Sequence, residues 1–250
     1  MSLIKPPPHL KISQWADKFR LLSTESSSEA GKFETSRAIF QKEIMDSIND
    51  PTITEVVVMS CSQIGKTEIL LNAIGYYIHY APAPILIVHP TLEMARAWSQ
   101  DRLAPMIRDT EILKYKVAEV KSKDSGNTVL HKIFDGGHIT ACGANSPASL
   151  ASRPIKIVLC DEIDRYPPTA GSEGDPVMLA KRRSATFWDS KLVLTSTPTV
   201  KGASAIESAF EDTDKRLFYV PCHKCKKKQV LKWSQVQWEK NKPETARYIC

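Results

Sequence analysis

The chain has 250 residues, of which 42% are apolar and 25% are charged, and its formal net charge is +6. This length can bury a full core, and the ordinary composition predicts a globular protein with one large domain or a domain plus a small module. The N-terminus has no continuous apolar stretch typical of a secretory signal, and Pro82 and Pro84 break the uncharged residues 69–88 into a helix and a strand, which excludes a membrane span.

Residues 1–35 are rich in proline, serine and charged residues, and we expect an N-terminal arm, amphipathic at 12–22, that packs on the main domain. The hydrophobic pattern beyond it predicts strands that alternate with helices. In chain order these are a helix at 38–48, a strand at 55–59, a helix at 69–78, a strand at 84–89, a helix at 92–107, a hairpin of 128–134 and 138–142, and strands at 155–160, 191–196 and 217–220. Such alternation predicts an α/β fold with a mostly parallel sheet and helices on both faces.

Residues 60–68, SCSQIGKTE, partly match the phosphate-loop pattern G-x-x-x-x-G-K-[ST]. Gly65, Lys66 and Thr67 fit its second half, and Ser60 stands at the first glycine. A strand precedes the loop and a helix follows it, so backbone N–H groups would point at phosphate oxygens. We expect Lys66 to reach the β- and γ-phosphates and Thr67 to bind Mg²⁺. The predicted nucleotide-binding residues of the loop are Ser60, Cys61, Ser62, Gln63, Ile64, Gly65, Lys66, Thr67 and Glu68.

Two acids follow the apolar run of IKIVLCDEID, at the end of a predicted strand. The carboxyl end of a parallel strand is the ligand-binding edge of an open sheet. There Asp161 would hold Mg²⁺ and Glu162 would orient the attacking water. The alternative, two solvated acids at a strand end, is less consistent with the loop upstream.

Polar residues at two other positions extend this predicted site. Thr195, Ser196 and Thr197 end the strand LVLTSTPT, where hydroxyls could sense the γ-phosphate. Gln41 precedes the first strand, and its amide offers both a donor and an acceptor to the adenine edge. An exposed helical glutamine is the alternative for that residue.

The six cysteines form two groups. Cys61, Cys142 and Cys160 occupy apolar, strand-like settings and are predicted to be buried thiols. Cys222 and Cys225 have the spacing of half a zinc site, and Cys250 could add a third thiolate. A fourth ligand would still be needed, and His223 is the weaker candidate.

The C-terminal end carries the excess positive charge. Residues 221–250 contain eight Lys/Arg and two Glu, which amounts to +6, so the first 220 residues balance to zero. This basic end could face nucleic acid. It could equally be a solvated charged face.

The chain resembles a known family, the GpA-like large terminase subunits of tailed bacteriophages. The segments that carry the resemblance are ISQWADKFRLLSTESS, FQKEIMDSI, VVVMSCSQIGKTE, GANSPASLASRP, DEIDRYP, EGDPVMLAKRR, LTSTPTVKG and FYVPCHKCKKKQVLKW. Such families tolerate a residue other than glycine at the first loop position. The resemblance implies a P-loop NTPase fold of the RecA/ASCE type, with an arm at 1–35, an ATPase domain at 36–220 and a truncated zinc-ribbon-like segment at 221–250.

The same resemblance implies a packaging motor that uses ATP and Mg²⁺ to drive duplex DNA into the procapsid. Its partners would be the terminase small subunit, the capsid portal and further copies in a ring, in the host cytoplasm and without a membrane. Arg102, Arg153 and Arg183 lie in family-like segments and are candidate arginine fingers, although most of them would be structural. The nuclease domain of complete family members has no counterpart in these residues.

Two other functions use parts of the same pattern. A nucleic-acid helicase shares the loop, the acids and the hydroxyls, but it would add a second similar sheet domain. A nucleotide-locked scaffold or zinc-dependent DNA-binding module would not turn over ATP, and such a module has no need of Glu162.

Overall fold

The computed structural model describes residues 9–27, 29–117, 126–151 and 153–250, so residues 1–8 and 28 of the predicted arm lie outside the described part. The chain divides into two compact units, Met1–Glu211 and Asp212–Cys250. No helix among the described residues combines the length and the apolar character needed to cross a membrane.

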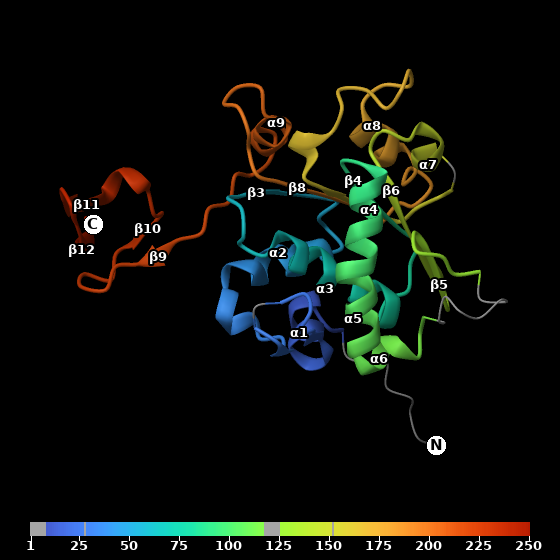
Figure 1. Cartoon of the computed structure of the whole chain (residues 1–250), viewed down its shortest axis with the longest axis horizontal. Helices are drawn as coiled ribbons and strands as arrows, with labels where there is room; N and C mark the ends of the chain where they lie inside the picture. Colours follow the sequence, from blue (N-terminus) through green and yellow to red (C-terminus); the bar gives the residue numbers. More distant parts are fainter. Residues whose placement is uncertain (1–8, 28, 118–125, 152) are drawn as a thin grey trace. The chain divides into compact units, whose positions relative to one another are not determined.

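A six-stranded sheet is the centre of the first unit (Figure 1). In spatial order its strands are β3 (Glu55–Met59), β8 (Lys191–Ser196), β7 (Ile157–Asp161), β4 (Ile85–His89), β6 (Gly137–Gly143) and β5 (His131–Phe134). Every neighbouring pair is parallel except β5 and β6, which form an antiparallel hairpin. The predicted mostly parallel sheet is therefore confirmed, with the predicted hairpin at one edge.

Helices cover both faces of this sheet (Figure 1). One side carries α1 (Ile12–Phe19), α2 (Phe40–Ile48), α3 (Lys66–His79), α4 (Leu92–Trp98), α5 (Ala104–Asp109) and α6 (Glu111–Lys114). The other carries α7 (Pro147–Ala151), α8 (Pro176–Arg182) and α9 (Ala205–Glu211). A π-helical segment, Ser99–Leu103, joins α4 to α5, in agreement with the single helix predicted there.

The strands are apolar along their length because both of their faces are buried. On β4, Ile85 and Ile87 pack in the core cluster that contains α3, whereas Leu86 and Val88 pack in the cluster that contains residues of α8. Successive side chains of a strand point to opposite faces, so two cores share one strand. This explains why the sequence reads as unbroken apolar runs.

The N-terminal segment contributes to the first of these cores. Trp15 and Ile12 of α1 are fully buried and belong to the cluster that includes α3. After α1 come the short pair β1 (Leu21–Leu22) and β2 (Gly31–Lys32) and a 3-10 turn at Thr35–Ala38. The segment therefore supports the helix that follows the loop at 60–65.

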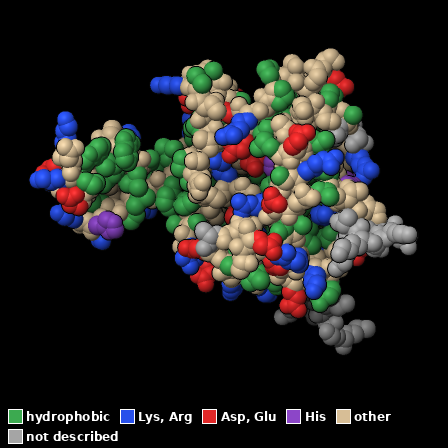
Figure 2. Space-filling view, in the orientation of Figure 1, with side chains coloured by type: hydrophobic (Ala, Val, Ile, Leu, Met, Phe, Trp, Pro, Cys, Tyr) green, Lys and Arg blue, Asp and Glu red, His purple; other side chains and the backbone are tan. Residues whose placement is uncertain are grey.

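The second unit consists of two small antiparallel sheets. These are β9 (Val220–Pro221) with β10 (Lys228–Gln229), and β11 (Val236–Glu239) with β12 (Lys242–Tyr248). A 3-10 turn at Trp233–Gln235 lies between them. Figure 2 displays apolar side chains gathered on this unit, where Trp233 and Trp238 are exposed.

The prediction of a buried strand at 217–220 is wrong. Leu217, Phe218 and Tyr219 are exposed, and of this run Val220 alone pairs, with Gln229. An apolar run becomes a buried strand when a neighbouring strand and a covering layer are available, and this run precedes a two-residue strand of the small unit.

Candidate functional site

Three loops meet at the carboxyl edge of the sheet because β3, β7 and β8 are parallel neighbours. The Nζ of Lys66 lies at their meeting point, and the lysine side chain is 6% exposed. It donates to the carbonyl oxygen of Cys61 at 3.1 Å and to Thr197 Oγ1 at 2.7 Å. Glu162 Oε1 lies 3.6 Å from the same Nζ. One ammonium group thus connects the loops after β3, β7 and β8.

The loop after β3 is shaped by two residues with positive φ, Gln63 at 64° and Gly65 at 85°. Ser60 is not among the positive-φ residues, so serine is sterically acceptable at the first loop position. A Cβ at Gly65 would also lie 2.4 Å from Gln41 Nε2, so a larger residue there would displace the Gln41 amide. Cys61 is exposed, so the prediction of a buried thiol is wrong for this residue because it lies in the loop rather than in the strand. Cys142 and Cys160 are buried as predicted.

Gln41 is buried and contacts the loop directly. Its Nε2 donates to the carbonyl oxygen of Ile64 at 2.8 Å. Its Oε1 is also buried and has no hydrogen-bond partner among the described groups. The alternative of an exposed helical glutamine is therefore wrong.

Asp161 ends β7 as a buried carboxylate. It accepts a hydrogen bond of 2.6 Å from Thr195 Oγ1, and His89 Nδ1 lies 3.9 Å away. Burial raises the pKa of Asp161, and the hydrogen bond from Thr195 and the charge of Lys66 offset part of that rise. Burial lowers the pKa of His89 to about 4, so this imidazole is neutral near pH 7 and contributes no positive charge beside the carboxylate. A buried carboxylate of this kind suits a hard divalent cation.

Glu162 has a left-handed backbone, with φ of 55°, which is uncommon for a residue other than glycine. Its Oε1 approaches Lys66, and its Oε2 lies 3.8 Å from Arg165 Nε. The side chain is 26% exposed, so water can reach it. Strain of this kind is concentrated at functional positions.

The hydroxyls at the end of β8 have three different surroundings. Thr195 is fully buried and bound to Asp161, and Thr197 accepts from Lys66. Ser196 is also fully buried, and its Oγ accepts from the backbone N–H of Asp164 at 3.2 Å. The structure therefore brings Thr195 and Thr197 to the acids and the lysine, and it directs Ser196 to the segment after β7.

Thr67 and Glu68 follow Lys66 in the first turn of α3. Glu68 Oε2 pairs with Arg20 Nη2 at 3.2 Å, and the Arg20 side chain is 1% exposed. The carboxylate of Glu68 is thus directed to the N-terminal segment. Ser62 is exposed in the loop.

The three candidate arginine fingers lie in three different surroundings. Arg102 is exposed and donates to the carbonyl oxygen of Ser26. Arg153 is exposed, with Nη1 3.2 Å from His131 Nε2. Arg183 is partly exposed, and its buried Nε has no partner among the described residues. These contacts lie outside the loop at 60–65, and a finger role stays a prediction.

Sequence reasoning missed three residues that shape this site, His89, Asp164 and Arg20. His89 ends β4 beside Asp161, Arg20 binds Glu68, and Asp164 connects two loops. Asp164 could have been suspected from the third carboxylate of DEID. The contributions of His89 and Arg20 depend on contacts between residues that are distant in sequence, and no local sequence pattern predicts such contacts.

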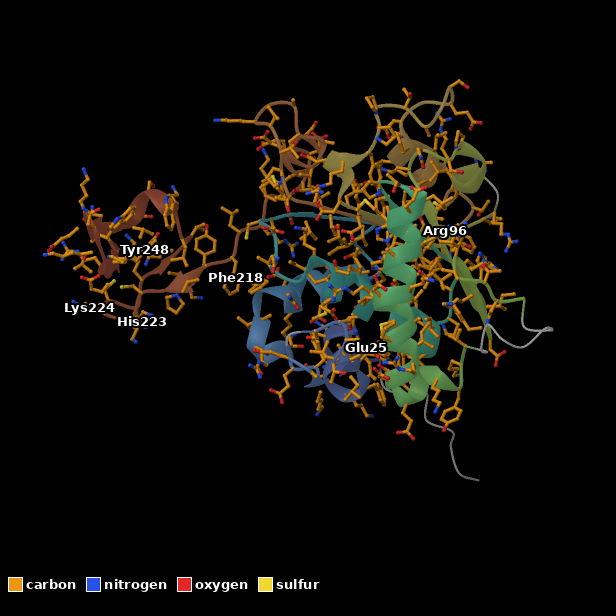
Figure 3. All side chains as sticks on the ribbon, in the orientation of Figure 1. Glu25, Arg96, Phe218, His223, Lys224 and Tyr248 are labelled. Carbon is orange, nitrogen blue, oxygen red and sulfur yellow. The ribbon has the colours of Figure 1, made fainter. Side chains whose placement is uncertain are left out.

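In the second unit the sulfur atoms of Cys222, Cys225 and Cys250 all lie within 4.8 Å of one another. Cys225 Sγ and Cys250 Sγ are 3.6 Å apart. Backbone N–H groups of Cys225 and Lys224 lower the pKa of Cys222 to about 7, which favours its thiolate. His223 and Lys224 occupy the turn between the first two cysteines (Figure 3).

Comparison with known proteins agrees with this architecture. Residues 27–250 match the family described as "Phage terminase large subunit gpA, ATPase domain". The chain is 32% identical over 259 residues to the "Terminase, large subunit" of Enterobacteria phage P21, an alignment that covers 100% of this chain and 40% of that protein. The crystal structure of the HK97 bacteriophage large terminase is similar with a TM-score of 0.64 and 13% identity, over 81% of this chain and 40% of that chain.

The fold and the family match together define an ATPase domain of the mixed α/β class with a mostly parallel sheet. More particularly, the chain belongs to the family of ATPase domains of phage terminase large subunits. It spans 40% of the length of the phage P21 relative, so it corresponds to part of such a protein.

Proposed function

We propose that this chain hydrolyses ATP at the carboxyl edge of its sheet and that it does so as the motor module of a phage DNA-packaging enzyme. The observation that carries the proposal is the position of Lys66 Nζ, buried among oxygens of three loops and 3.6 Å from Glu162. A fixed ammonium beside an acid that water can reach is what phosphoryl transfer to water requires.

The residues then have separate roles. Lys66 binds the β- and γ-phosphate oxygens. The backbone N–H groups of the loop at 60–65, at the N-terminus of α3, also donate hydrogen bonds to the phosphates. Glu162 accepts a hydrogen bond from water and orients it toward the phosphorus. The free Oε1 of Gln41 fits the amino group of adenine. Thr197, which contacts Lys66, is placed to respond to the γ-phosphate.

Asp161 and Thr67 would hold Mg²⁺. The fit rests on Asp161, a buried carboxylate that one threonine hydroxyl and the charge of Lys66 compensate in part. When bound, the cation neutralises charge that develops on the phosphate oxygens. Thr67 follows Lys66 in the first turn of α3, where a Mg²⁺-binding hydroxyl of a phosphate loop is expected.

Duplex DNA is the proposed substrate of the motor, with the small subunit, the portal and further copies in a ring as partners in the bacterial cytoplasm. The matching family comprises ATPase domains of phage terminase large subunits, and the phage P21 relative is a terminase large subunit. The basic second unit supports a role in DNA contact, since residues 221–250 carry +6 of formal charge. A helicase is not favoured, because the chain continues from the ATPase unit into this small cysteine-containing unit.

Phosphate release measured with and without duplex DNA tests the proposal. We expect the release of phosphate to depend on Mg²⁺. The release should also be slow, because an arginine from a neighbouring copy is missing in a monomer. Nucleotide binding without any release would support the nucleotide-locked module, and absence of nucleotide binding would refute the proposal.

We also propose that Cys222, Cys225 and Cys250 hold a zinc ion in the second unit. Tetrahedral zinc with Zn–S bonds of about 2.3 Å separates its sulfur ligands by about 3.8 Å. The Cys225–Cys250 separation of 3.6 Å agrees with that geometry. A fourth ligand, water or His223, would complete the tetrahedron.

Metal content and cobalt substitution test this site. We expect about one zinc per chain and, with Co²⁺, the absorption of a thiolate-bound tetrahedral ion. Cys225→Ser should abolish both, whereas Cys142→Ser, a buried thiol of the first unit, should leave them unchanged. Equal zinc content in the two variants would refute the site.

A further inference from the structure

Asp164 is a half-buried residue whose carboxylate accepts several hydrogen bonds. It lies in the 3-10 turn Ile163–Arg165, directly after Glu162 and the end of β7. Its Oδ2 accepts from the backbone N–H of Thr199 at 2.8 Å and from Thr199 Oγ1 at 2.9 Å. Its Oδ1 accepts from the backbone N–H of Ile206 at 2.8 Å. The hydroxyl of Ser204 adds a further hydrogen bond.

The backbone of Asp164 makes a second connection in the same direction. Its N–H donates to the buried Oγ of Ser196 at 3.2 Å. Side chain and backbone together therefore attach the turn after β7 to the end of β8, to the segment that follows it and to the start of α9. Hydrogen bonds to an ionised carboxylate are stronger than those between neutral groups, so the carboxylate is the firmest of these attachments.

These attachments flank the two residues that approach Lys66. Glu162, which lies 3.6 Å from Lys66 Nζ, precedes Asp164 by two positions. Thr197, which accepts from the same Nζ at 2.7 Å, precedes Thr199 by two positions. The contact between Asp164 and Thr199 thus closes a ring of contacts that passes through Glu162, Lys66 and Thr197. Without it, the part of the segment at 197–204 nearest Thr197 would lose its two hydrogen bonds to the turn that follows Glu162.

We propose that Asp164 is a positioning residue for ATP hydrolysis, which holds Glu162 and Thr197 in register around Lys66 by binding Thr199 and Ile206. This inference rests on the proposed ATPase function. It assigns Asp164 no contact with nucleotide, because its four acceptor contacts are made to the segment at 199–206.

The test separates the rate of the chemical step from nucleotide affinity in the full chain. We expect Asp164→Ala to lower kcat by tenfold or more, since misplacement of a reacting group by about 1 Å can cost as much as 10²-fold. The Kd for an ATP analogue should change by less than about threefold, because the loop at 60–65 and Lys66 remain in place. Thr199→Val retains the backbone N–H but removes the hydroxyl donor, so its effect on kcat should be smaller and in the same direction.

Asp175→Ala is the matched control. Asp175 also accepts from a backbone N–H at the start of a helix, Met178 N at 2.7 Å, but on α8 rather than beside Lys66. Both variants lose a helix cap and should lower the melting temperature by similar amounts. A purely structural role predicts that both affect kcat alike, and that outcome would overturn the inference.

Two results distinguish this inference from the proposed function. If the parent chain and Asp175→Ala release phosphate and Asp164→Ala does so at the parent kcat, Asp164 has no positioning role and the ATPase stands. If the parent chain binds nucleotide but releases no phosphate, the proposed function fails and the inference fails with it. A fall of kcat in Asp164→Ala with parent-like kcat in Asp175→Ala supports both.

Discussion

The indole of Trp15 lies against the backbone of Gly75. A Cβ at position 75 would be 2.2 Å from Trp15 Cη2 and 2.8 Å from Cζ3, so α1 and α3 approach each other closely enough to require glycine. Trp15 is fully buried, and its Nε1 donates to His79 Nδ1 at 3.1 Å. Since α3 begins with Lys66, this contact connects the N-terminal segment to the helix that follows the loop at 60–65.

Gly75→Ala should therefore destabilise the protein although alanine is the better helix former. The gain in helix propensity is at most about 1 kcal/mol. Overpacking of a rigid ring typically costs about 1–3 kcal/mol, so we expect a net loss on the order of 1–2 kcal/mol in the free energy of unfolding. Urea unfolding measures it. Adding Trp15→Phe should relieve the clash, so the two changes together should cost less than their sum. If Gly75→Ala were as stable as the parent, α1 and α3 could move apart without loss of stability, and the prediction would be wrong.

Substitutions of Lys66 and Glu162 should affect nucleotide binding and ATP turnover differently. Lys66→Ala removes the partner of the phosphate charge, so both nucleotide affinity and turnover should be lost. Glu162→Gln keeps the shape and removes the acceptor charge, so nucleotide should still bind while turnover falls by about 10²-fold or more. Phosphate release and equilibrium binding of an ATP analogue measure the two effects. Parent-like turnover in Glu162→Gln would contradict the role assigned to that residue.

The strand, loop and helix between residues 55 and 79 could be predicted from the sequence because the patterns that specify them are local. An apolar run, a glycine-containing loop and an amphipathic helix follow one another between 55 and 79, and the structure has β3 and α3 there. The acids after β7 and the hydroxyls after β8 were predicted for the same reason. Parallel strands bring their carboxyl ends to one edge, so three local patterns defined one candidate site.

Other features depend on contacts that no local pattern contains. The placement of β8 between β3 and β7 is a property of the whole sheet. The role of Asp164 depends on Thr199 and Ile206, which are distant in sequence. The error at 217–220 has a related cause, since the apolar run LFYV is suited to a strand but lies outside the large sheet. Local propensity states what a segment can form, and tertiary contacts decide whether it does.

Duplex DNA should bind without sequence preference and with a strong dependence on salt. Each Lys or Arg that neutralises a phosphate releases counterions, with a slope of about −0.9 per contact in log K against log salt. Lys224→Gln with Lys227→Gln in the basic second unit should weaken binding and make the slope shallower, by up to about two contacts. Lys114→Gln with Lys116→Gln, two exposed lysines of the first unit, is the control. Fluorescence anisotropy at several salt concentrations measures both, and identical slopes for the two pairs would argue against DNA contact by the second unit.

The neutral state of His89 should make stability depend on pH. Burial lowers its pKa from the ordinary value of 6.5 to about 4. Between these two values the unfolded chain binds a proton that the folded chain does not, so acid favours unfolding. The contribution of His89 to stability is complete above pH 6.5, decreases as the pH falls from 6.5 toward 4, and decreases no further below that.

His89→Asn isolates this contribution because asparagine does not titrate. The variant loses ring packing against Trp98, whose ring centroid is 5.0 Å away, so it should be less stable than the parent at pH 7.5. The difference should shrink on acidification, by up to about 1.4 kcal/mol per pH unit between pH 6 and pH 4.5, because only the parent must keep a buried imidazole unprotonated. Urea unfolding of both proteins at pH 7.5, 6.0, 5.0 and 4.5 measures it, and the other titrating groups common to both cancel to first order. A constant difference across this range would mean that protonated His89 is accommodated in the fold, with Asp161, 3.9 Å away, as its counter-charge.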